Sequence, residues 1–100
     1  MSIDNATSAP DIAAPPDAEQ VHEWVPRGEG LAIRVFDGTV REAAGFTIQV
    51  GGVQHQNGTC RRWVAIEAAG RTVGAAMEPE SLRQLSAALS AAADEIEARR

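Results

Sequence analysis

The chain has 100 residues, of which 23% are charged and 44% are hydrophobic, and its formal net charge is −5. Residues 1–20 carry four acids and no base, so the rest of the chain is close to neutral. A neutral body argues against nucleic acid as a partner, because such binding depends on neutralising several phosphates. The single cysteine excludes an internal disulfide framework.

The N-terminus has no basic start followed by an apolar stretch, so we expect no secretory signal peptide. No run approaches the ~18 consecutive apolar residues that a membrane span requires. We therefore expect a cytoplasmic protein with no membrane partner. The chain also lacks lysine and is rich in alanine, a bias typical of GC-rich genomes, which favours an actinobacterium or one of its phages as the source.

Residues 1–20 are predicted to be a disordered acidic tail rich in alanine and proline. The segment has almost no large apolar side chain that could offset its ordering entropy. Residues 21–100 are predicted to form a single domain. Within it, Trp24 is expected to pack against the domain edge.

Residues 31–36 alternate in a way that predicts a β-strand. Asp37-Gly38 follows, and this pair is a preferred two-residue hairpin turn because both residues tolerate positive φ. A returning strand over residues 39–42 would then place Arg34 opposite Arg41. Like charges directly opposed are unfavourable. Either nearby carboxylates screen them, or residues 39–44 form a looser segment.

A second hairpin is predicted where residues 46–56 and 59–68 flank Asn57-Gly58, a strong hairpin signature. A two-residue turn there places His55 opposite Cys60. A cysteine–histidine pair is part of some catalytic and zinc sites. However, nucleophilic catalysis also needs an orienting group and an oxyanion pocket, and zinc needs three or four ligands. We therefore expect an ordinary polar pair at a sheet end.

The same two-residue turn would leave the apolar residues of the two strands out of step. One extra residue at Gly51-Gly52 restores the pairing of Val50 with Val64 and of Ile48 with Ile66. Bulges favour glycine and leave one residue unpaired. The sequence therefore predicts a β-bulge at Gly51-Gly52.

Ala69-Gly70 is predicted to turn the chain into a last strand over residues 71–76, and Pro79 to begin a helix. Proline suits the first helical position because its missing N–H needs no partner there. The helix has one apolar stripe, made of Leu82, Leu85, Leu89, Ala92 and Ile96. We expect this stripe to cover an apolar sheet face made of Leu31, Ile33, Val35, Phe46, Ile48, Val50, Val53, Val64 and Ile66. The predicted fold is α+β, an antiparallel β-meander of three to five strands packed against one C-terminal α-helix.

One helix covers only one face of such a sheet, so the other face meets solvent or a partner. The candidate partner-binding residues on that face are Trp63, Arg61, Arg34, Arg41, Gln49, Gln54 and Phe36. Tryptophan and arginine are enriched at the energetic hot spots of interfaces. The alternative is that Trp63 is covered by the N-terminal segment, with Trp24 as one candidate cover.

No motif in the sequence indicates a catalytic, phosphate-binding or metal-binding site. The carboxylates near the end of the helix fit a solvated face, and the glycine-containing stretches match no phosphate loop. We therefore expect a protein that is not an enzyme and has no cofactor or metal. The first hypothesis is a small protein-binding accessory module, with a phage-encoded protein acting on a host protein as one form of it. The alternatives are a structural homo-oligomer that uses the outer sheet face as a self-interface and, more weakly, a nucleic-acid-binding accessory protein. The modest core favours dimerisation.

The C-terminal half of the chain resembles a group of known proteins. Glu78–Leu89 and Ala91–Glu95, preceded by Gly52-Val53-Gln54 and by Trp63, resemble the ending of many short, largely uncharacterised proteins from actinobacteria and their phages. The similarity covers roughly residues 46–96. It implies a β-meander followed by an Ala/Leu-rich helix and an accessory role, and it carries over no catalytic residue.

Overall fold

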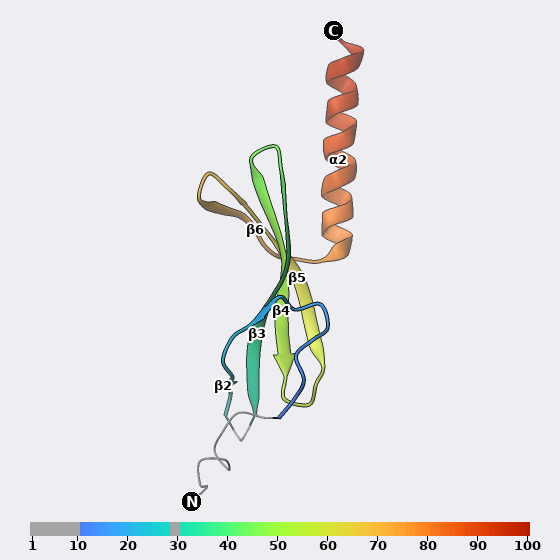
Figure 1. Cartoon of the computed structure of the whole chain (residues 1–100). Coiled ribbons are helices and arrows are strands. Elements are labelled where there is room, and N and C mark those ends of the chain that lie inside the picture. The colour runs from blue at the N-terminus through green and yellow to red at the C-terminus, as the bar shows by residue number, and fades with distance from the viewer. Residues whose placement is uncertain (1–10, 29–30) are drawn as a thin grey trace, which may run out of the picture.

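The computed structural model describes residues 11–28 and 31–100, and it contains a six-stranded antiparallel sheet followed by one helix (Figure 1). The elements are β1 (Gln20–Val21), β2 (Val25–Pro26), β3 (Ala32–Ala43), β4 (Phe46–His55), β5 (Cys60–Ala68), β6 (Arg71–Met77) and α2 (Pro79–Ala98). The strand order is β1-β3-β4-β5-β6, and β2 also pairs with β3. The predicted α+β class, with an antiparallel meander and one C-terminal helix, is confirmed.

The first predicted turn is wrong. Asp37-Gly38 lies inside β3, and the register with β4 shifts between Asp37 and Val40. A Cβ atom on Gly38 would lie 3.1 Å from the carbonyl oxygen of Val50, so this glycine allows a close approach of two strands. The chain reverses instead at Ala44-Gly45, where φ is 53° and 84°. Positive φ at both central residues is typical of a type I′ turn.

The predicted bulge at Gly51-Gly52 is also wrong, because β4 and β5 pair one to one from Phe46↔Ala68 to Gln54↔Cys60. The extra residue lies in the turn. The Gly58 N–H donates to the His55 carbonyl at 2.8 Å, and Gly58 has a φ of 93°. This is the pattern of a three-residue hairpin loop that ends in a left-handed glycine.

The unbroken register confirms the predicted pairs Val50↔Val64 and Ile48↔Ile66 but changes the two faces of the sheet. Because side chains alternate along an unbroken strand, the even-numbered residues of β4 share one face over its whole length. The predicted apolar face is therefore divided. Phe46, Ile48, Val50, Val64 and Ile66 lie on one side, and Ile33, Val35 and Val53 lie on the other.

A short N-terminal segment, residues 11–18, runs across the lower half of the sheet (Figure 1). We call it the strap. Pro15 is buried against the sheet, and Ile12 and Ala18 are half-buried. The predicted disordered tail is thus wrong for the strap, because its backbone carbonyls and Asp17 bind side chains of the sheet. Residues 1–10 of that prediction lie outside the described residues.

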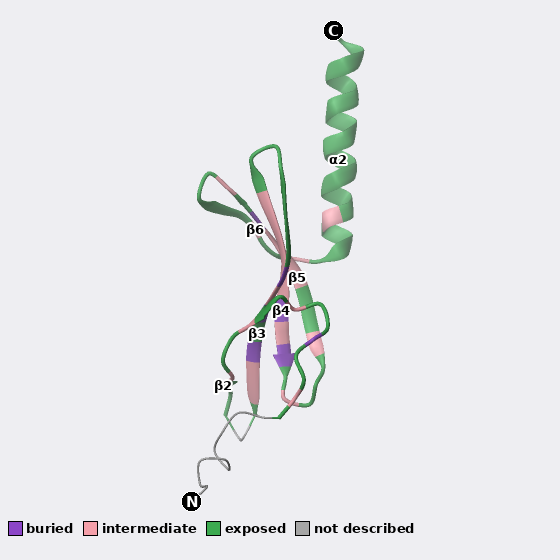
Figure 2. Cartoon of the chain, viewed as in Figure 1, coloured by how far each residue is buried: buried purple, intermediate pink, exposed green. Residues whose placement is uncertain are grey.

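Helix α2 begins at Pro79 as predicted, but it stands clear of the sheet (Figures 1 and 2). None of its residues is buried. The apolar stripe that was expected to cover the sheet is exposed instead, with Leu89 62% and Ile96 60% accessible. A single residue, Glu78, joins β6 to α2. Connections between a strand and a helix that covers its sheet typically have about two to six residues, so the join is too short to fold α2 back.

Candidate protein-binding surfaces

Two polar side chains are buried beneath the strap. Arg34 is 9% exposed and Gln54 is 3% exposed. The Arg34 Nε–H donates to Oε1 of Gln54 at 2.8 Å. Arg34 Nη2 donates to the Ile12 carbonyl and Gln54 Nε2 donates to the Ala13 carbonyl, each at 2.9 Å. Both residues were predicted to face a partner, and that placement is wrong, because they bind the chain's own strap.

The buried Arg34 guanidinium also lies against an aromatic ring. Its central carbon is 4.5 Å from the centroid of the Trp24 ring, within the range of a cation–π interaction. Trp24 therefore caps this arginine rather than simply packing at a domain edge. Among residues 11–28 and 31–100, no carboxylate forms an ion pair with Arg34. Carbonyl and amide oxygens and the ring thus replace the water that the cation would otherwise bind.

Phe36 is the largest buried side chain of the described residues, and it is fully inaccessible. Its predicted place on an exposed binding face is therefore wrong. The Phe36 ring lies above Gly52, where an added Cβ atom would come within 3.0 Å of the ring and would collide with the carbonyl oxygen of Arg61. The Arg62 guanidinium lies 5.5 Å from the ring centroid on the same side. Phe36 belongs to the small core that the strap closes.

The far end of the strap is held by a bidentate ion pair. Asp17 accepts hydrogen bonds from Nε and Nη2 of Arg62 at 2.9 and 2.7 Å. The hydrogen bonds from Arg62 hold the pKa of Asp17 below its usual value, and the same bonds raise the pKa of Arg62. A paired carboxylate and guanidinium of this geometry fix orientation as well as adding energy. The strap is therefore attached at both ends.

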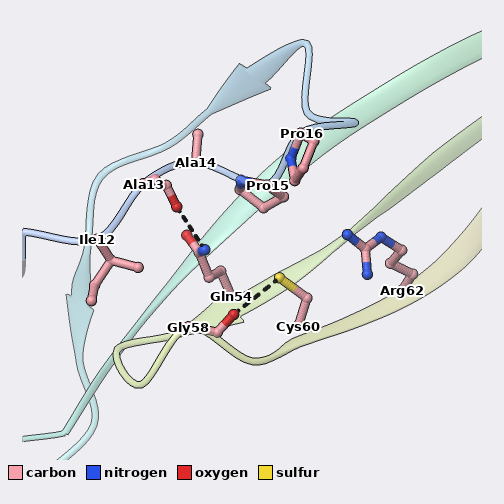
Figure 3. Close-up of a pocket in the computed structure, with 9 residues that line it drawn as sticks. All are labelled: Ile12, Ala13, Ala14, Pro15, Pro16, Gln54, Gly58, Cys60 and Arg62. Atoms are coloured by element: carbon pink, nitrogen blue, oxygen red, sulfur yellow. Dashed lines mark hydrogen bonds between the residues drawn. The ribbon is translucent and has the colours of Figure 1, made fainter.

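An open hollow lies between the strap and the β4–β5 hairpin (Figure 3). Its volume is about 480 Å³, and it is lined by Ile12, Ala13, Ala14, Pro15, Pro16, Gln54, Gly58, Cys60 and Arg62. The polar groups on its wall already have partners in the chain: Gln54 binds Ala13, and Cys60 lies 3.8 Å from the Gly58 carbonyl. The hollow thus offers no converging set of free polar groups for a ligand.

The predicted pair of His55 and Cys60 is not formed. Cys60 pairs with Gln54, and the two residues point to the strap side of the sheet. His55 is adjacent to Gln54 in β4, so its side chain points to the opposite side. Within the described part of the chain, no group of three or more histidine, cysteine or carboxylate side chains could hold a metal ion.

On the side of the sheet that faces away from the strap lie four residues that we call the open face: Val35, Val53, Arg61 and Trp63. Val35, Val53 and Arg61 form one cross-strand row, and Trp63 lies in the next row opposite Gly51. Val35 is 42% exposed and the Arg61 side chain is 71% exposed, while Trp63 is half-buried. Trp24 stacks on Arg34, on the strap side, so it does not cover Trp63. Arg61 Nη2 forms a loose ion pair with Glu78 at 3.4 Å.

The two remaining predicted residues lie further along the sheet. Gln49 opposes Val40, which puts it on the same side as the open face, and it is half-buried. Arg41 opposes Ile48 on the strap side, is exposed and donates to Oγ1 of Thr39 at 2.9 Å. Of the seven predicted residues, the structure therefore brings only Trp63, Arg61 and Gln49 to one exposed side.

Sequence reasoning missed a second uncovered surface, the apolar stripe of α2. The stripe was recognised, but it was assigned to the core because amphipathic helices usually cover their own sheet. The sequence held no clear signal, because the predicted strand ended at residue 76 and left two residues before Pro79. The structure extends β6 to Met77 and leaves only Glu78 between the strand and the helix.

Comparison of the chain with protein-family models, with curated proteins and with solved structures found no match. The resemblance to short actinobacterial and phage proteins therefore stays a prediction. Helix α2, the one helix of the described residues, lacks the length of apolar sequence that would let it cross a membrane. The case for a function rests on the two uncovered surfaces.

Proposed function

We propose that the chain is a small non-enzymatic module that binds another protein through surfaces that its own fold leaves uncovered. The observation that carries the proposal is the apolar surface that the described residues leave uncovered on the open face and along α2.

Few large apolar side chains of the described residues are buried within the chain. Among the described residues only Phe36 and Ile66 are buried hydrophobic side chains. The exposed large hydrophobic residues are Val25, Leu31, Val35, Val40, Phe46, Val73, Leu85, Leu89 and Ile96. Extended exposed apolar surface is rare on soluble monomers and typical of protein-interaction sites. A protein partner that covers part of it would offset the weakness of the internal core.

The open face is the part of this surface best suited to a different protein. It combines an aromatic ring with an arginine and two valines, and tryptophan and arginine are the residues that most often dominate interface energetics. Arg61 forms only a loose ion pair with Glu78. An acidic residue of the partner could therefore take the place of Glu78 at little cost in free energy. We retain the proposal that the partner is a cytoplasmic protein of an actinobacterial host.

A site-specific photo-cross-linker tests this proposal. Arg61 is replaced by a photoreactive phenylalanine derivative, and the purified chain is irradiated in a lysate of actinobacterial cells. A discrete cross-linked band is expected from position 61. It should be absent from the matched position Arg71, an exposed arginine at the β5–β6 turn. Substitution of Trp63 by Ala should remove the band while the melting temperature stays within a few degrees. Equal labelling from both positions would contradict the proposal.

A structural homo-oligomer is the second candidate function, and one observation favours it. The stripe of α2 is exposed beyond the half-buried Leu82, with Leu85, Leu89 and Ile96 each more than a third accessible. Such a stripe fits a second helix better than it fits a flat surface. The two candidates are compatible, because the open face and α2 are separate surfaces.

A further inference from the structure

We propose that α2 forms a parallel, in-register pair with α2 of a second copy of this chain. This inference rests on the proposed protein-binding function and names the partner for one of its two surfaces. The helix has 20 residues and no buried side chain. In proteins, most of the stability of a helix comes from tertiary packing of its amphipathic face. A second copy supplies that packing at a position that the chain's own sheet does not reach.

The apolar residues of α2 have the spacing of a helix pair. Leu82, Leu85, Leu89, Ala92 and Ile96 follow one another at steps of three, four, three and four residues. In a heptad labelled a to g, this places Leu82, Leu89 and Ile96 at position a, with Leu85 and Ala92 at position d. All charged residues of the helix proper fall at other positions. Such a pattern lets two helices meet along one continuous apolar seam.

The centre of the helix is adapted to close approach. From Leu85 to Ala93 it contains no charged residue, and it consists of leucine, alanine and serine only. Every residue in this stretch is exposed. No charged side chain in this stretch would therefore have to lose its water when a second helix packs against it. Small side chains beside the seam would let the two backbones come close, as leucines at positions a and d interdigitate.

The sequence also favours the parallel arrangement over the antiparallel one. In a parallel pair each apolar layer meets its own copy, and Arg99 lies beyond the end of α2 in water. In an antiparallel pair, positions a and d face each other, so Leu82 would lie opposite position 99 and would have no apolar partner in α2 of the other copy.

Pairing through α2 leaves the open face free, because that face lies on the sheet and the apolar seam lies on the helix. The dimer and a different protein partner do not compete for the same residues.

Sedimentation velocity over a range of concentrations tests the pairing. The wild-type chain should sediment as a dimer at micromolar concentrations. Leu89→Asp places two charges in the seam and should weaken the dimer by at least about 100-fold. Ser90→Asp, on the outer side of the helix, is the matched control and should leave the dimer intact. Because Leu89 is 62% exposed in the single chain, the sheet should stay folded in both variants, and circular dichroism checks this.

Disulfide trapping tests the register. In a Cys60→Ser background, Ala92→Cys should cross-link two copies under mild oxidation. Asp94→Cys, which points away from the seam, should remain monomeric on a denaturing gel. Equal cross-linking at both positions, or a wild-type chain that is monomeric at every concentration, would overturn the pairing. A strict monomer that is still photo-cross-linked through position 61 would overturn only this inference and leave the proposed function standing.

Discussion

Arg34 and Gln54 are bonded side chain to side chain at 2.8 Å across β3 and β4, and both are almost fully buried. Each of them also donates to a carbonyl of the strap. The interior of the lower sheet is thus organised by polar groups that fix the path of an N-terminal segment. Buried polar networks of this kind are stable only when every member has its partner.

Gln54→Leu should therefore lower the free energy of unfolding by about 2–3 kcal/mol, because it leaves the buried Arg34 short of an acceptor and the Ala13 carbonyl short of a donor. Urea unfolding at a fixed protein concentration measures the change. Gln20→Leu, at an exposed position of β1, is the control and should stay within about 0.5 kcal/mol of wild type. Equal effects of the two variants would show that the network is not what holds the strap.

Gly52→Ala should destabilise the fold by about 3 kcal/mol, since its new methyl group collides with the Arg61 carbonyl and presses on the Phe36 ring. Gly51→Ala is the matched control, because its Cβ meets only the Phe36 carbonyl oxygen, at 3.1 Å. We expect about 1 kcal/mol there. Thermal unfolding of both variants checks the order, and a larger loss for Gly51→Ala would contradict the packing.

Ala44→Asn and Ala69→Asn should each stabilise the chain by about 0.5–1 kcal/mol, because both alanines hold a left-handed conformation that asparagine tolerates better. Their φ values are 53° and 54°. Ala43→Asn, at the neighbouring strand position, is the control and should give no gain. The midpoint of urea unfolding measures all three, and an unchanged midpoint for both turn variants would contradict the left-handed conformation of these two alanines.

The attachment of the strap should depend on acid pH through Asp17. Its pKa is lowered in the folded state, mainly by the hydrogen bonds from Arg62, from an ordinary value of 3.8. The pair therefore stabilises the strap fully above about pH 4. That contribution is lost as the pH falls through the lower, folded-state pKa. The Ala18 and Glu19 amides, which donate to the Pro15 and Asp37 carbonyls at 3.0 and 2.7 Å, should exchange faster at low pH than their intrinsic pH dependence predicts. Asp17→Asn should show raised exchange at neutral pH and no such transition.

Much of the sheet could be predicted from the sequence because its turns and strand alternation are local signals. The alternation of residues 46–56, the Asn57-Gly58 turn and the start of the helix at Pro79 were all read from neighbouring residues. The faces could not be assigned in the same way. A hairpin loop of two residues or of three residues fits Asn57-Gly58 equally well, and the choice reverses the side of every residue in the lower half of β4.

The strap escaped prediction for a different reason. Its residues supply backbone carbonyls and one carboxylate rather than a large apolar surface, so composition alone classed it as disordered. The informative residues were Arg34 and Gln54, whose polar groups needed partners once they lay inside the sheet. Long-range partners of this kind do not follow from sequence spacing.

The central claim is that α2 and the open face bind other protein chains. Hydrogen exchange of α2, measured as a function of protein concentration, tests this claim most directly. A helix without tertiary contacts should exchange rapidly, whereas a helix buried by another chain is protected. We predict that amides from Leu82 to Ile96 are little protected at nanomolar concentration and become strongly protected at micromolar concentration. Strong protection that does not change on dilution would show that α2 is covered within its own chain, and would contradict the account.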